Sequence, residues 1–158
     1  MIATTQEQSA RLLRCGVSAD TADMCWRGAI VPIGGSLTSM PEPSEEWDLW
    51  ADSYDSMPEE MQKAKLMEDY TEIVPAWSLS ALCKLLPREI KVDPSPYDEI
   101  QRYGLLIYPF MGGWQVDYQY CEDDECHCLV CRHGDNLIEA CVKAIEWLTS
   151  NGYKLNEI

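Results

Sequence analysis

Basic residues are scarce in this chain. Its 158 residues include 12 Lys and Arg against 27 Asp and Glu, which gives a formal net charge of −15. Residues 28–62 contain no Lys or Arg at all, although eight acidic residues fall in that range. Contacts to nucleic-acid phosphates depend on clustered Lys and Arg, so we expect no direct binding to nucleic acid.

Long apolar runs are also absent. Nowhere do 18 apolar residues follow one another, and the first fourteen residues contain no apolar segment of signal-peptide length. We therefore expect no membrane span and a cytoplasmic location. Thiols stay reduced in that compartment, so the eight Cys are expected to be free thiols.

Recognisable catalytic motifs are missing as well. His127 and His133 are the only histidines, and the chain has no Gly-x-Ser-x-Gly, P-loop or His-Glu-x-x-His sequence. Acid–base catalysis by two carboxylates would be possible in principle, but no pattern selects a pair among the 27 acids. We expect a protein that is not an enzyme and that needs no cofactor.

What the sequence does contain is a composition suited to one folded domain, residues 1–158, with 46% apolar residues. Caps and apolar spacing predict helices over 4–16, 78–86 and 135–152. A short helix over 18–26 is expected to form a helical hairpin with the first. Acids in that short helix, Asp20 and Asp23, argue against a DNA-reading helix-turn-helix.

The last third of the chain predicts an antiparallel meander. Strands are expected over 105–110, 114–120 and 126–132, with the final helix laid on their apolar face, which gives an α+β fold class. In the middle strand, alternate side chains should pack in the core, and the side chains between them should be exposed to solvent. The packed set is Trp114, Val116, Tyr118 and Tyr120, and the wet set is Gln115, Asp117 and Gln119.

Strands in the first half are expected to be short. One is predicted over 29–35, at a sheet edge because Pro32 cannot donate a ladder hydrogen bond, and another ends at Val74. Residues 91–98 are expected to be a loop.

The acidic segment 41–69 is predicted to be a helical insertion in the domain. Ser44 would cap a first short helix, and Ser56 with Glu59 forms the capping box of a second. An aromatic stripe on the first helix would either pack onto the domain or anchor a protein partner. The candidate partner-binding residues are Glu45, Glu46, Trp47, Asp48, Trp50, Asp52, Tyr54 and Asp55.

An alternative hypothesis makes this segment an inhibitor. Its carboxylates would imitate nucleic-acid phosphates and occupy a basic groove of the partner. The candidate surface is Glu45, Glu46, Asp48, Asp52, Asp55, Glu59 and Glu60.

The segment CEDDECHCLVCRHG, residues 121–134, raises the possibility of a zinc site. The alternative ligand set is Cys126, Cys128, Cys131 and His133. Structural zinc sites usually combine two Cys-x-x-Cys knuckles, and only one is present; on a regular strand its two thiols would also point to opposite faces. Cys83 and Cys141 fall at apolar positions of predicted helices, where Cys acts as a small apolar residue. We therefore expect no metal, with zinc as the alternative.

Four segments resemble a group of small uncharacterised proteins encoded by gut-bacterial genomes, their phages and mobile elements. They are TADM at 21–24, PAWSLSALCKLLP at 75–87, GGWQVDY at 112–118 and DNLIEACVKAIEWLTSNGY at 135–153. The acidic segment and the cysteine-rich turn depart from that group, which has no established activity. The resemblance implies a non-enzymatic accessory protein of a mobile element, which we expect to bind a protein partner through an acidic surface.

Overall fold

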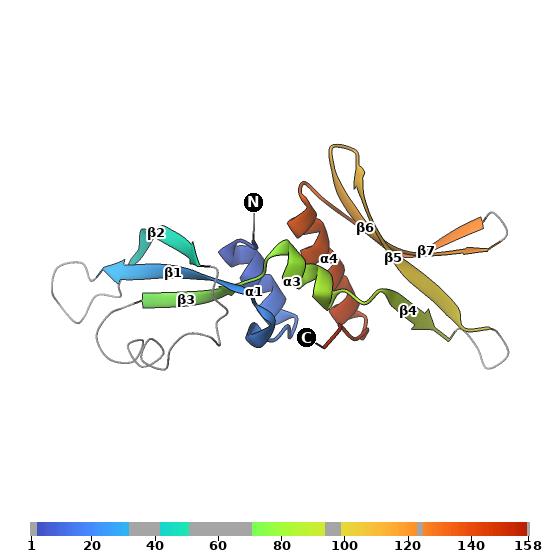
Figure 1. Ribbon diagram of the computed structural model, residues 1–158, viewed down its shortest axis with the longest axis horizontal. Helices are drawn as coiled ribbons and strands as arrows, with labels where there is room; N and C mark the ends of the chain where they lie inside the picture. The colour runs from blue at the N-terminus through green and yellow to red at the C-terminus, as the bar shows by residue number, and fades with distance from the viewer. Residues whose placement is uncertain (1–2, 32–41, 51–70, 94–98, 123–124, 158) are drawn as a thin grey trace.

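The computed structural model describes residues 3–31, 42–50, 71–93, 99–122 and 125–157, and gives the backbone alone for 27–31, 42–50 and 71–73. Helices lie in the middle of the molecule, and a sheet extends from them at each end (Figure 1). The predicted α+β class, with an antiparallel meander in the C-terminal half, is confirmed. None of the described helices is long and apolar enough to cross a membrane.

The N-caps of three helices lie within one residue of the starts that the sequence predicts. Helix α1 spans Gln6–Arg14, helix α3 Leu79–Leu85 and helix α4 Leu137–Ser150. Thr5 and Gln8 form a reciprocal capping box at the start of α1, while Ser78 and Asn136 cap α3 and α4. Gly16, at φ +85°, follows the C-cap of α1 in the left-handed region that glycine adopts without strain.

The short helix expected over 18–26 is wrong in part. Only a single 3₁₀ turn forms, Ala19–Thr21, and strand β1 begins at Met24. The chain therefore leaves α1 through a turn and enters a sheet, so there is no helical hairpin. A single turn of 3₁₀ helix is a common connector, because 3₁₀ geometry is stable only over a few residues.

Strand β1 (Met24–Val31) is the centre of a three-stranded antiparallel sheet, between β2 (Glu42–Trp50) and β3 (Thr71–Ala76). The predicted edge position of the first strand is therefore wrong, because β1 is paired on both sides. Pro32, which suggested an edge, lies outside the described residues with the rest of the predicted strand to residue 35.

Strand β2 occupies a segment that was predicted to be a helix starting at Ser44, and that prediction is wrong for residues 42–50. Its backbone pairs with β1 along most of its length, for example Gly28 with Trp47 and Cys25 with Trp50. An isolated short helix is marginal in water, and pairing with β1 gives the backbone a hydrogen-bonded partner. The rest of the predicted acidic insertion, including its second helix, lies outside the described residues.

The N-terminal segment joins this sheet to the helices. Thr4 donates its N–H to the carbonyl of Trp77 at 2.9 Å, and its hydroxyl accepts the N–H of Trp77 at 2.9 Å. The fully buried Trp77 ring donates to the Thr21 hydroxyl at 2.9 Å. A large aromatic residue thus fixes the corner where β3 runs into α3.

The four-stranded sheet has the order β4 (Glu89–Val92), β5 (Gln101–Phe110), β6 (Gly113–Glu122) and β7 (Glu125–Gly134), all antiparallel. β4 takes up the first part of a segment that was predicted to be a loop. Helix α4 packs on one face of this sheet, against β6 and β7. Val116, Tyr118 and Val130 meet it there in the buried core.

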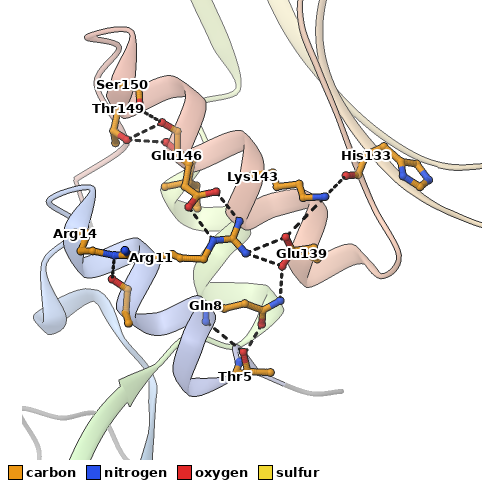
Figure 2. Close-up of polar contacts among 12 residues, drawn as sticks. Thr5, Gln8, Arg11, Arg14, His133, Glu139, Lys143, Glu146, Thr149 and Ser150 are labelled. Carbon is orange, nitrogen blue, oxygen red and sulfur yellow. Dashed lines mark hydrogen bonds and ion pairs between the residues drawn. The ribbon is translucent and has the colours of Figure 1, made fainter.

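Helix α1 is fastened to α4 by Arg11 (Figure 2). Its guanidinium donates to Glu146 at 2.8 and 2.5 Å and to Glu139 at 2.9 and 3.1 Å. Gln8 adds a bond to Glu139 at 2.6 Å. The hydrogen bond from Arg11 is the main reason that the pKa of Glu146 is lowered, and the same bond is the main cause of the raised pKa of Arg11.

Candidate binding face of the four-stranded sheet

Helix α4 covers one face of the four-stranded sheet, and among the described elements none packs on the other (Figure 1). We call this second surface the open face. Strand register places three rows of side chains across it. The rows are Tyr108–Gln115–His133, Leu106–Asp117–Cys131 and Gly104–Gln119–Cys128.

Asp117 lies at the centre of the open face and is 1% exposed. Its Oδ2 accepts hydrogen bonds from the Tyr108 hydroxyl at 2.5 Å, Gln119 Nε2 at 2.9 Å and Gln115 Nε2 at 3.0 Å. The prediction that this set of residues is wet is therefore wrong for Asp117 and Gln115, because side chains of the neighbouring strands close over them. The bond to the carboxylate raises the pKa of Tyr108 to about 12.

The second carboxylate oxygen, Asp117 Oδ1, is buried without a well-formed hydrogen bond. The thiol of Cys131 lies beside the carboxylate. Burial, and then the nearby Asp117, raise the pKa of this thiol to about 11. The pKa of Cys128 is raised for the same two reasons. Thiols held in their protonated form are poor nucleophiles, so the open face carries no activated cysteine.

A β-bulge in β7 decides where these thiols point. Tyr118 pairs with Val130 and Gln119 with Cys128, so Leu129 is an extra residue without a partner of its own. The expectation that Cys128 and Cys131 would point to opposite faces is therefore wrong: the extra residue turns both toward Asp117.

The alternative zinc ligands nevertheless do not converge. Cys126 to His133 spans seven residue steps of extended chain, roughly 23 Å at about 3.3 Å per residue, whereas the donors of one ion must each lie within about 2.3 Å of it. The His133 ring instead contacts the carbonyl of Phe110 at 3.1 Å. Across the described residues, no group of three or more His, Cys, Asp or Glu side chains is placed to hold a metal ion.

Cys126 has a different partner, because it is paired in register with Cys121 and forms a disulfide with it. The expectation that all eight Cys are free thiols is wrong for this pair. Five others are in no disulfide: Cys15, Cys83, Cys128, Cys131 and Cys141.

The end of the β5–β6 hairpin, residues 109–114, borders the open face, and we call it the hairpin tip. Met111 and Gly112 form its two-residue turn, both with positive φ, at +47° and +79°. Met111 is 86% exposed. Four of the six exposed large hydrophobic side chains in the described part of the chain belong to this hairpin: Leu106, Phe110, Met111 and Trp114.

The residues predicted to bind a partner lie elsewhere. Glu45, Glu46, Trp47, Asp48 and Trp50 are in β2, an outer strand of the three-stranded sheet. Asp52, Tyr54, Asp55, Glu59 and Glu60 lie outside the described residues. β2 belongs to the sheet at one end of the molecule, and the hairpin tip belongs to the sheet at the other end (Figure 1). The sequence carries one sign of the hairpin tip, the apolar Pro-Phe-Met run directly before a Gly pair that separates two predicted strands. No protein-family model, no curated protein and no solved structure matches the chain.

Proposed function

We propose that this chain is a non-enzymatic interaction protein of a phage or mobile element, and that it inserts the hairpin tip into an apolar recess of a protein partner. The observation that carries this proposal is Met111, a large apolar side chain displayed at the apex of a turn that does not suit it. Phe110 and Trp114, which are exposed on the two faces of the same hairpin, supply the remaining contact surface.

The turn gives Met111 its significance. Two-residue turns with both φ values positive favour Asn-Gly or Gly-Gly, since non-glycine residues other than Asn and Asp rarely adopt positive φ. Holding Met there costs about 1 kcal/mol relative to a residue suited to the turn. Strain of this kind concentrates at binding sites, where the side chain it displays is useful.

The charge of the chain defines the partner further. Residues 109–114 carry no charged side chain, while the whole chain has a net charge of −15. Two copies would repel one another, so a second copy of this chain is a poor occupant, whereas a basic protein with an apolar recess would be attracted over the distance at which charges act. We therefore expect apolar contact at the hairpin tip and basic residues around the recess.

The experiment first finds the partner and then tests the tip. A photocrosslinking amino acid at position 111, introduced in the organism that makes the protein, should capture one partner that the same group at Arg14 on α1 does not. Binding of the purified partner is then measured by calorimetry for the wild type and for Met111→Asn. We expect Met111→Asn to weaken binding at least 10-fold, about the 1.4 kcal/mol of one buried apolar anchor, while it raises the melting temperature.

If Met111→Asn makes the protein more stable but weakens binding, Met111 contacts the partner, because loss of a structural role would lower stability as well. Unchanged affinity of Met111→Asn would refute the proposal. The acidic alternative predicts another outcome: affinity would fall steeply with added salt and with the combined variant Glu45→Gln, Glu46→Gln and Asp48→Asn, which leaves the hairpin tip intact.

A further inference from the structure

Strands β6 and β7 extend beyond the rest of the four-stranded sheet as a two-stranded ribbon. Among the described residues, the pairing of β5 with β6 ends at Gly104–Gln119. Strands β6 and β7 stay paired for three further positions, Tyr120–His127, Cys121–Cys126 and Glu122–Glu125. Residues 125–128 are all exposed, and successive side chains of a strand point to opposite faces, so neither face of β7 is covered there. A two-stranded ribbon without a packed face is marginal in water.

The ribbon also holds like charges against each other. Glu122 and Glu125 are directly opposite, and like charges in this position destabilise a strand pair. Two contacts act against the repulsion: the stacked rings of Tyr120 and His127, with centroids 6.3 Å apart, and the Cys121–Cys126 disulfide. The disulfide is the covalent one, so we expect the pairing of the ribbon to depend on it.

The disulfide lies at a pair to which the backbone contributes least. The Cα atoms of Cys121 and Cys126 are 4.1 Å apart, which is the close spacing of an antiparallel pair that exchanges no backbone hydrogen bonds. Side chains alone therefore join the two strands at this pair. Both cysteines are exposed, and exposed disulfides are the ones that thiols reduce readily.

We propose that the Cys121–Cys126 disulfide is a site of reversible exchange with a dithiol reductant, and that its reduction opens the ribbon. A dithiol suits this reaction because its second sulfur completes the reduction within one molecule. The reduced strands then separate under the repulsion between Glu122 and Glu125, while the part of β6 and β7 that α4 covers stays paired.

Reduction takes two exchange steps. In the first, a thiolate of the dithiol attacks one sulfur of the protein disulfide, a bond forms between them, and the other cysteine leaves as a thiolate that takes up a proton. In the second, the remaining thiol of the reductant gives up its proton and attacks the reductant's own bound sulfur. This expels the second cysteine, which also takes up a proton. The protein disulfide gains two electrons, and the dithiol loses two and becomes a cyclic disulfide.

The test reduces the folded protein with dithiothreitol in the absence of denaturant. Alkylation and peptide mass spectrometry then identify the reactive cysteines. Cys121 and Cys126 should be alkylated only after reduction. Cys141 is fully buried, as its predicted role of a small apolar residue requires, so it should stay unlabelled and report that the fold is intact. Cys83 was also predicted to be packed, which is wrong because it is exposed, and it should be labelled with or without reductant.

Amide hydrogen exchange measures the opening of the ribbon. Exchange of the Tyr120 and His127 amides should accelerate at least about 10-fold on reduction, because closing so short a loop is expected to suppress local opening roughly 40-fold. The amides of Val116 and Val130, which lie in the core with α4, should not change. Reoxidation with glutathione disulfide should restore slow exchange.

Two variants separate the disulfide from the charges. Cys121→Ser with Cys126→Ser should exchange rapidly from the start and should not respond to dithiothreitol. Glu122→Gln with Glu125→Gln keeps the disulfide and removes the repulsion, so reduction should accelerate its exchange less than that of wild type. A wild-type disulfide that resists dithiothreitol until the protein unfolds would overturn the proposal. Complete reduction that leaves the exchange of Tyr120 and His127 unchanged would also overturn it.

Discussion

Replacing Arg11 by Met should loosen helix α1 from α4. The substitution keeps an unbranched apolar stem and removes the four N–H···O contacts that the guanidinium makes with Glu139 and Glu146. Hydrogen bonds to charged groups contribute about 1.5–3 kcal/mol each when buried, whereas exposed ion pairs contribute about 0–1 kcal/mol. The side chains of Arg11, Glu139 and Glu146 are 20%, 18% and 29% exposed, so water replaces many of the hydrogen bonds that the substitution removes.

We expect a loss of about 2 kcal/mol in the free energy of unfolding, which lowers the melting temperature by roughly 4–8 °C for a chain of this length. Urea unfolding followed by circular dichroism measures it. Arg14→Met is the matched control on the same helix, because within the described part of the chain Arg14 donates to the carbonyl of Ala10 and to no carboxylate. It should change stability by less than about 0.5 kcal/mol. If Arg11→Met were as mild as its control, or if a double-mutant cycle with Glu146→Gln showed no coupling, the two helices would be held together by apolar packing alone.

Two other predictions concern titrating groups. Asp117→Asn should return the pKa of Tyr108 from about 12 toward the ordinary value near 10. The ultraviolet absorbance of the phenolate measures this pKa, after subtraction of the same titration in Tyr108→Phe. An unchanged pKa would mean that the Asp117 carboxylate is not the cause of the shift. The pKa of Glu146 is lower in the folded than in the unfolded chain, so its contribution to stability is present above its unfolded pKa of about 4.3 and is lost as pH falls through the lower folded value. Wild type should therefore lose stability in acid more steeply than Glu146→Gln, and parallel urea midpoints from pH 7 to pH 3 would contradict this.

Local chemistry made the three helices predictable. Thr5, Ser78 and Asn136 each accept a backbone N–H of the first helical turn, and such bonds involve only neighbours in sequence. Residues 42–50 were misjudged because their aromatic spacing fits a helix, whereas the partner strand that makes them extended lies about 20 residues earlier. Long-range pairing overrides a local preference of this kind.

The candidate site was harder to predict for the same reason. Alternation along β6 correctly placed Asp117 opposite the packed Val116 and Tyr118, although Trp114 of the predicted packed set is exposed. The burial of Asp117 depends on Tyr108 from β5 and on the thiols of β7. The pairing of Cys121 with Cys126 likewise follows from the register of two strands, which no spacing rule supplies.

The bulge in β7 also determines where this strand can change length. Val130 and Cys128 already oppose consecutive residues of β6, so a chain without Leu129 could keep both halves of the ladder and lose only one partly buried side chain. Deletion of any other residue of β7 would shift the register by one residue. The side chains beyond the deletion would then move to the opposite face of the sheet. Position 129 is thus the place at which evolution could shorten β7 without rebuilding the open face.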